Sequence, residues 1–341
     1  MRRITPAAWA GLAFIVSQAS WASTITQTVG AYSDNQGLTR HRVGYDVILD
    51  GGGGVANLTG SSYELAVTHD AYQRSDLTTD EYDREIYGSG YKTNDAVTAS
   101  ASQTWDRLTE TRVLAAYATD QKVSSRTFSV GASQWQRSET VRLSVDVSRT
   151  LLEQPLYQIL DYDSKEVGNP PIASSTGATV QLRHLATPTT IVDYSASHIV
   201  TANRPDTNTG TLAVRQFVPQ LSAAFHATLT RAVNRGFITT ETNYGQVDAW
   251  IVETAYLQNL WKGARSRLAY RYYKEDETTR AYGDETVFGS DTMSVGMAQD
   301  IPRRATGSLG IPLTIEAAAA RYLTNVAVAA NSFEASVTAK F

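Results

Sequence analysis

Histidine is the residue type in this chain best suited to acid–base or nucleophilic chemistry, because cysteine is absent. A serine hydrolase needs a serine, a histidine and an orienting polar group that meet on one face. Ser197 precedes His198 and His69 precedes Asp70, but consecutive residues of a strand point to opposite faces. Three further histidines, His41, His184 and His226, complete the set, and no His-x-Ser sequence occurs. We therefore expect no enzyme, and a catalytic rim is the last of three functional alternatives.

Acidic residues gather in one predicted loop, at Asp76, Asp80, Glu81, Asp83 and Glu85. Carboxylate oxygens suit calcium. The spacing nevertheless lacks the Asp-x-Asp-x-Asp-Gly pattern of a defined calcium loop. We expect a solvated loop there, with no metal site and no cofactor.

The N-terminal residues have the pattern of an export signal. Met1, Arg2 and Arg3 give a basic start, an apolar stretch runs over residues 7–16, and Ser20-Trp21-Ala22 supplies small residues for a peptidase. Ten apolar residues are too few to cross ~30 Å of hydrocarbon. The sequence predicts a signal peptide over residues 1–22 and a single exported domain over residues 23–341. With 30 basic and 34 acidic residues, the chain has no basic excess for binding nucleic acid.

Apolar and polar residues alternate with a period of two through most of the remaining chain. In one segment Val141, Leu143, Val145 and Val147 alternate with Arg142, Ser144 and Asp146. The last strand, Phe333–Phe341, has the same pattern. Such alternation is typical both of a soluble sandwich and of a membrane barrel. Many long segments and a terminal Phe341 favour the barrel, and a C-terminal phenylalanine resembles the signal that the bacterial barrel-assembly machinery reads.

Connection lengths then predict a topology. Long polar connections are expected at Ser75–Lys92, Glu153–Thr176, Ala202–Gly210, Gly236–Tyr244, Glu275–Glu285 and Thr324–Ser332. Short connections are expected at Leu108–Thr111, Arg137–Glu139, Thr187–Thr189, Pro219–Gln220 and Lys262–Arg265. Outer-membrane barrels place short turns in the periplasm and long loops outside. We predict an all-β fold, a transmembrane antiparallel up-and-down barrel of about 16 strands, with about 14 or 18 as alternatives. Its first strand, Thr26–Ser33, is expected to pair with Phe333–Phe341.

Three stretches resemble a family of proteobacterial outer-membrane barrels catalogued as a domain of unknown function. They are Tyr32-Ser33-Asp34-Asn35 followed by Thr39-Arg40 and Asp50-Gly51-Gly52-Gly53, then Asn203-Arg204-Pro205-Asp206-Thr207, and finally the run from Arg267 to Tyr273. The resemblance implies a barrel in the outer membrane and no established activity. The segment Arg231 to Arg235 departs from the tyrosine-rich strand end of that family, so no ligand carries over.

Charged residues on predicted strands indicate which face is the lumen. A charged side chain facing lipid costs about 2–4 kcal/mol at the bilayer midplane. Six charged residues are therefore expected to line the lumen: Arg142, Asp146, Arg183, Arg267, Arg271 and Lys340. Two interpretations stay open, because such charges either pair and hold the wall together or create a field that selects solutes.

The sequence thus predicts a bacterial outer-membrane barrel with three alternative functions. The first is a porin-like channel for small solutes. The second is a non-conducting scaffold that holds a lipoprotein or a periplasmic partner, and the third is the catalytic rim. In each case we expect contact with outer-membrane lipid and lipopolysaccharide and with the assembly machinery, and no nucleic acid.

Overall fold

The computed structural model describes residues 22–35, 37–51, 60–74, 91–106, 108–120, 124–153, 173–201, 206–235, 247–275, 289–306, 311–325 and 328–341. Sixteen strands occupy this part of the chain. They are β1 Ala22–Asp34, β2 Leu38–Gly51, β3 Ser61–Arg74, β4 Tyr91–Thr104, β5 Thr109–Asp120, β6 Ser124–Trp135, β7 Val141–Glu153, β8 Ala173–Thr187, β9 Thr190–Thr201, β10 Asp206–Val218, β11 Ala223–Arg235, β12 Val247–Trp261, β13 Ala264–Glu275, β14 Gly289–Ile301, β15 Leu313–Thr324 and β16 Ala329–Lys340. The predicted signal peptide falls almost wholly on residues 1–21, outside the described residues.

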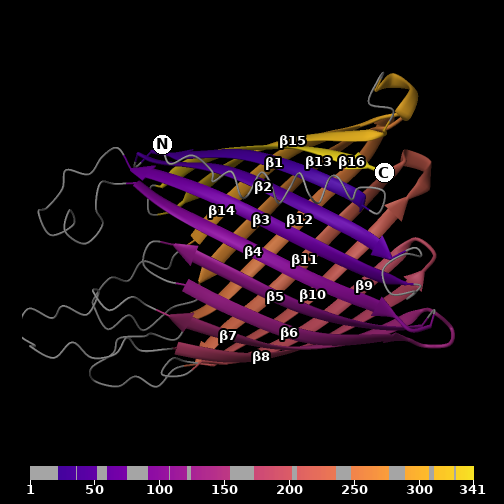
Figure 1. Cartoon of the computed structure of the whole chain (residues 1–341), viewed down its shortest axis with the longest axis horizontal. Helices are drawn as coiled ribbons and strands as arrows, with labels where there is room; N and C mark the ends of the chain where they lie inside the picture. Colours follow the sequence, from indigo (N-terminus) through magenta and orange to yellow (C-terminus); the bar gives the residue numbers. More distant parts are fainter. Residues whose placement is uncertain are drawn as a thin grey trace, which may run out of the picture.

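The strands form one closed antiparallel barrel in which each strand pairs with its sequence neighbours (Figure 1). β1 and β16 close the wall, in a register that sets Val29 opposite Ala335. The hydroxyls of Thr26 and Thr338 lie 3.0 Å apart across this seam. The predicted barrel, its strand number and the pairing of its first and last strands are confirmed. No helix in the described part of the chain is long and apolar enough to cross a membrane.

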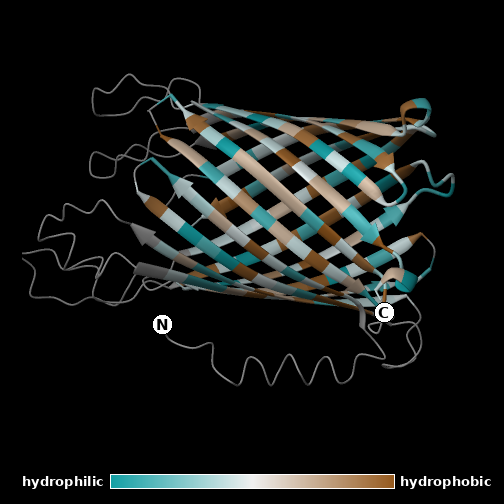
Figure 2. Ribbon diagram, turned by 90° about the horizontal axis from the view of Figure 1, so that it is seen from above, coloured by the Kyte–Doolittle hydropathy of each residue, from teal (hydrophilic) through white to brown (hydrophobic). Residues whose placement is uncertain are grey.

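The two faces of the wall differ in chemistry. Large apolar side chains on one face are exposed, among them Val130 at 62%, Val147 at 51% and Leu268 at 54%. No large side chain among the described residues is fully buried. A soluble sandwich of this length would bury its apolar face between sheets. Here that face points outward, as lipid contact requires, and the hydropathy alternates along the strands (Figure 2).

The two ends of the barrel differ in the length of their connections. Residues 136–140, 188–189, 219–222 and 262–263 are short turns at the end where the C-terminus lies (Figure 1). At the other end, the segments that join β3 to β4 and β7 to β8 comprise residues 75–90 and 154–172. The short-turn end is therefore the periplasmic end.

Several predicted boundaries were wrong by a few residues. β10 already begins at Asp206 and β16 at Ala329, so two of the predicted long connections are shorter. The short connection predicted at Pro219–Gln220 extends to Ser222, since Pro219–Leu221 form a 3-10 turn and proline cannot donate to a strand ladder. Boundaries are set by local turn bonds that periodicity does not reveal.

Asp106 explains one such boundary, since β5 begins at Thr109 rather than after Thr111. Its carboxylate accepts hydrogen bonds from the backbone N–H groups of Leu108 and Thr109, both at 2.7 Å. These bonds close the turn early and lower the pKa of Asp106.

Candidate functional site

The structure places all six sequence-predicted lumen residues on the inner face. Arg142 and Asp146 lie on β7, Arg183 on β8, Arg267 and Arg271 on β13, and Lys340 on β16. Their strand neighbours in sequence, such as Leu143, Val145, Leu182 and Leu268, are exposed on the opposite face. The period of two therefore separates the faces as expected.

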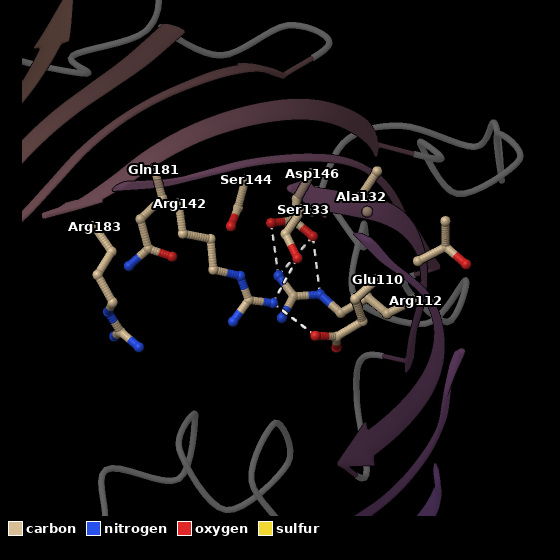
Figure 3. Close-up of a pocket in the computed structure, with 11 residues that line it drawn as sticks. Glu110, Arg112, Ala132, Ser133, Arg142, Ser144, Asp146, Gln181 and Arg183 are labelled. Atoms are coloured by element: carbon tan, nitrogen blue, oxygen red, sulfur yellow. Dashed lines mark hydrogen bonds and ion pairs between the residues drawn. The ribbon is translucent and has the colours of Figure 1, made fainter. Parts of the chain in front are cut away.

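Three of the six meet in one polar recess of about 210 Å³ on the inner wall (Figure 3). Four strands supply its polar side chains: Glu110 and Arg112 from β5, Ser133 from β6, Arg142, Ser144 and Asp146 from β7, and Gln181 and Arg183 from β8. Sequence reasoning missed Glu110 and Arg112. The inner face of β5 continues with Leu114, Ala116 and Ala118, so this strand shows no alternation of apolar and polar residues.

An ion pair in the recess joins β5 to β7 across β6, the strand between them. Arg112 on β5 donates to both carboxylate oxygens of Asp146 on β7, at 2.7 and 2.6 Å. Gly131 on β6 stands between them in register. A Cβ at that position would lie 2.0 Å from Oδ1 of Asp146. The absence of a side chain at Gly131 is therefore what lets the pair close.

A second row places two arginines side by side. Arg142 and Arg183 are directly opposite each other on β7 and β8. Arg142 binds Glu110 at 2.6 Å, and Arg183 binds Asp193 of β9 at 2.7 Å. Like charges directly opposite on neighbouring strands repel. Each guanidinium is therefore paired with an acid on the side away from the other arginine. Both arginines line the recess.

Other inner-face charges are paired in part. Arg271 binds Glu253 at 3.1 Å, and Arg265 binds Asp300 at 3.2 Å. Within the described ranges, the side chains of Arg215, Arg267 and Lys340 make no hydrogen bond or ion pair. The lumen thus contains both kinds of charge that the sequence left open. Some charges form ion pairs that connect strands, and some cations remain available to attract solutes.

The histidine candidates lie on the outer face. His69 pairs with Asp95 at 2.6 Å, while its sequence neighbour Asp70 points inward to Arg42. His198 lies 2.8 Å from the side-chain oxygen of Asn208. Its neighbours on the outer face are Ala178, Ala196 and Val200, none of which offers a nucleophile.

No cluster able to hold a metal ion is present in the part of the chain that the structure describes. The acidic loop Asp76–Glu85 lies outside the described residues.

No family model matches the chain, and no curated protein matches it. The resemblance to the uncharacterised family therefore stays a prediction. Solved outer-membrane proteins do match in fold. CdiB from Acinetobacter baumannii superposes with a TM-score of 0.63 at 9% identity, over 92% of this chain and 60% of its own. OccK7 (OpdD) from Pseudomonas aeruginosa gives 0.56 at 10% identity, over 94% and 98%. OpdK with vanillate, from the same organism, gives 0.51 at 8%, over 95% and 99%.

These likenesses concern the fold. The chain spans 60% of the length of CdiB but nearly all of OccK7 and OpdK. An apolar outer face around a closed antiparallel wall is stable only in a bilayer, where open sheet edges do not occur. The chain is a sixteen-strand antiparallel β-barrel of the bacterial outer membrane.

Proposed function

We propose that the barrel conducts small polar solutes through its lumen, and that the recess at Arg142 and Arg183 favours those carrying an anionic group. Barrels of 16–18 strands are wide enough to leave an aqueous channel. The inner face is polar, and no helix of the described chain fills it. The observation that carries the proposal is the arginine pair, directly opposed and aimed at the lumen.

The chemistry of the recess suits a carboxylate or a phosphate. Arginine presents several N–H donors in a planar fork that matches such groups. Glu110 binds Arg142 and Asp193 binds Arg183, each on the side away from the other arginine. Ser144 and Gln181 add neutral polar groups beside them. A solute anion between Arg142 and Arg183 would lower their mutual repulsion, and the flanking acids would keep the binding weak enough for release.

Reversal potentials in planar bilayers under a potassium chloride gradient test the proposal. The wild type should form open channels. Replacing both arginines, Arg142→Gln and Arg183→Gln, should lower the chloride-to-potassium permeability ratio by about twofold or more. A matched control, Arg303→Gln with Arg304→Gln, removes the same charge from the periplasmic turn and should leave the ratio nearly unchanged.

Solute flux tests the anionic preference. Liposome swelling with vanillate and with acetate, compared with an uncharged sugar of similar size, should show faster entry of the carboxylates, and the double arginine variant should lose the difference. A barrel that is silent in bilayers would overturn the channel and favour the scaffold. A conducting barrel whose ion preference ignores both arginines would overturn the role of the recess.

A further inference from the structure

Charge on the outer face of the barrel is confined to one end. Among the residues whose side chains the structure describes, the lysines and arginines on this face are Arg126, Arg149, Arg231, Lys274 and Arg321, and the acids are Asp95, Asp206 and Asp291. Each lies within a few residues of the strand end that leads to the extracellular connections. The periplasmic half of this face carries no described lysine, arginine or acid. Charges facing hydrocarbon are costly near the midplane and cost only about 0–1 kcal/mol near the interface.

Arg126 and Arg149 form the densest positive spot on this rim. In the β6–β7 register Arg126 stands opposite Leu151, and Phe128 opposite Arg149. The two arginines are therefore diagonal neighbours, close enough for both guanidinium groups to reach one ligand. Both are exposed. The side chain of Arg149 makes no hydrogen bond or ion pair with any described residue.

A second pair of cations lies farther round the rim, on β11 and β13, with a tryptophan between them. Arg231, Trp250 and Lys274 form one row across β11, β12 and β13. The guanidinium of Arg231 lies 5.1 Å from the centre of the Trp250 ring. Tryptophan marks the interfacial layer of a membrane, which places these cations at headgroup height.

Two of the three described acids on the rim have donors of their own. Asp95 binds His69 at 2.6 Å, and Asp291 accepts the hydroxyl of Tyr270. Lys274 and Arg321, like Arg149, have no such partner among the described residues. The described rim thus has more cations than acids, and three of its cations are without a partner, so it favours an external anion over an external cation.

We propose that this rim binds the phosphate groups of lipopolysaccharide, with Arg126 and Arg149 as its principal site. Arginine recognises phosphate with paired, charge-assisted hydrogen bonds. Directly below the pair, toward the membrane, Phe128, Val130 and Val147 are exposed at 57%, 62% and 51%. This ridge offers a surface for the acyl chains of the lipid whose phosphates the arginines hold. One side of the site is thus polar and the other apolar, which matches an amphipathic lipid.

Lipid binding to the purified, folded barrel in detergent tests the site. The probes are bis-phosphorylated lipid A, the same lipid A after removal of its phosphates, and phosphatidylglycerol, and native mass spectrometry measures their binding. Bis-phosphorylated lipid A should bind at least about tenfold more tightly than the dephosphorylated form. The variant Arg126→Gln with Arg149→Gln should lose most of that difference, whereas Arg303→Gln with Arg304→Gln should keep it.

Three outcomes would overturn the proposal: equal binding of lipid A with and without phosphates, equal loss in the periplasmic control, or phosphatidylglycerol binding as tightly at the same arginines. The comparison of the two lipid A forms uses the wild type, so it decides even if the double variant does not fold. The lumen is not involved, and a failure here leaves the channel proposal unaffected.

Discussion

Two rows of the inner wall place an arginine, a glycine and an acid on three successive strands, yet their charges behave differently. In one row Arg112, Gly131 and Asp146 lie in register, and the ion pair closes over the glycine at 2.6 Å. The other row has Arg42, Gly30 and Glu334. Here no pair closes, and the side chain of Glu334 has no hydrogen bond or ion pair with any described residue.

The difference arises on the strand next to each arginine. Arg42 stands directly opposite Asp70 of β3 and donates to it at 2.8 and 3.0 Å. The position that faces Arg112 on β4 is Ser102, which carries no charge. A glycine therefore leaves space for an ion pair across a strand, but Arg42 binds the acid on the adjacent strand instead, because directly opposed side chains are the nearest neighbours in a sheet.

The largest expected effect comes from removing the competing acid. Asp70 is 3% exposed and also accepts a hydrogen bond from Arg40 at 2.8 Å. The variant Asp70→Asn should lower the free energy of unfolding by about 2 kcal/mol or more, because it leaves two partly buried arginines without their shared carboxylate. Urea unfolding in phospholipid vesicles, followed by tryptophan fluorescence, measures the loss.

The same variant sharpens the comparison through Glu334. Without Asp70, Arg42 should turn across Gly30 to Glu334, as Arg112 turns to Asp146. Glu334→Gln should then cost more in the Asp70→Asn background than in the wild type, with a coupling of about 0.5–1 kcal/mol in a double-mutant cycle. Strictly additive losses would show that the glycine gap at residue 30 cannot carry an ion pair.

The next effect concerns the glycines themselves. Gly131→Ala should lower the free energy of unfolding by about 1 kcal/mol, because its Cβ would displace the Asp146 carboxylate and weaken the ion pair. Gly30→Ala is the matched control, since its Cβ would meet only ordinary contacts at 3.5 Å and beyond. This control should be neutral or slightly stabilising, because glycine is entropically costly in a strand. Equal losses in the same unfolding assay would contradict the structural role of Gly131.

Sequence periodicity was sufficient to predict the barrel, because alternation over residues 140–148 and 333–341 defines an apolar and a polar face. It predicted one common face for Arg142 and Arg183, since charge and lipid exclude each other, and both residues line the same recess. Pairing partners could not be predicted in this way. Glu110 and Asp146 reach arginines two strands away, and that reach depends on register and on the small residues between.

The same limit explains the strand ends and the outer rim. Asp106 fixes the start of β5 through two backbone bonds that no period records. Arg126 and Arg149 are charged residues at positions where the pattern of their strands calls for an apolar residue. Only the register of β6 and β7 shows that the two arginines lie at the same end of the barrel.

The smallest effect on stability is expected at Arg267, which shares the row of Glu334. Gly296 and Ala318 separate the two charges in register, so they stand three strands apart and neither binds the other. Arg267→Gln should change the free energy of unfolding by less than about 0.5 kcal/mol. It should still shift the reversal potential toward cations, because an unpaired cation contributes its full field to the lumen. An unfolding loss as large as that of Gly131→Ala would show that Arg267 does hold the wall, and the division between paired and available charges would then fail.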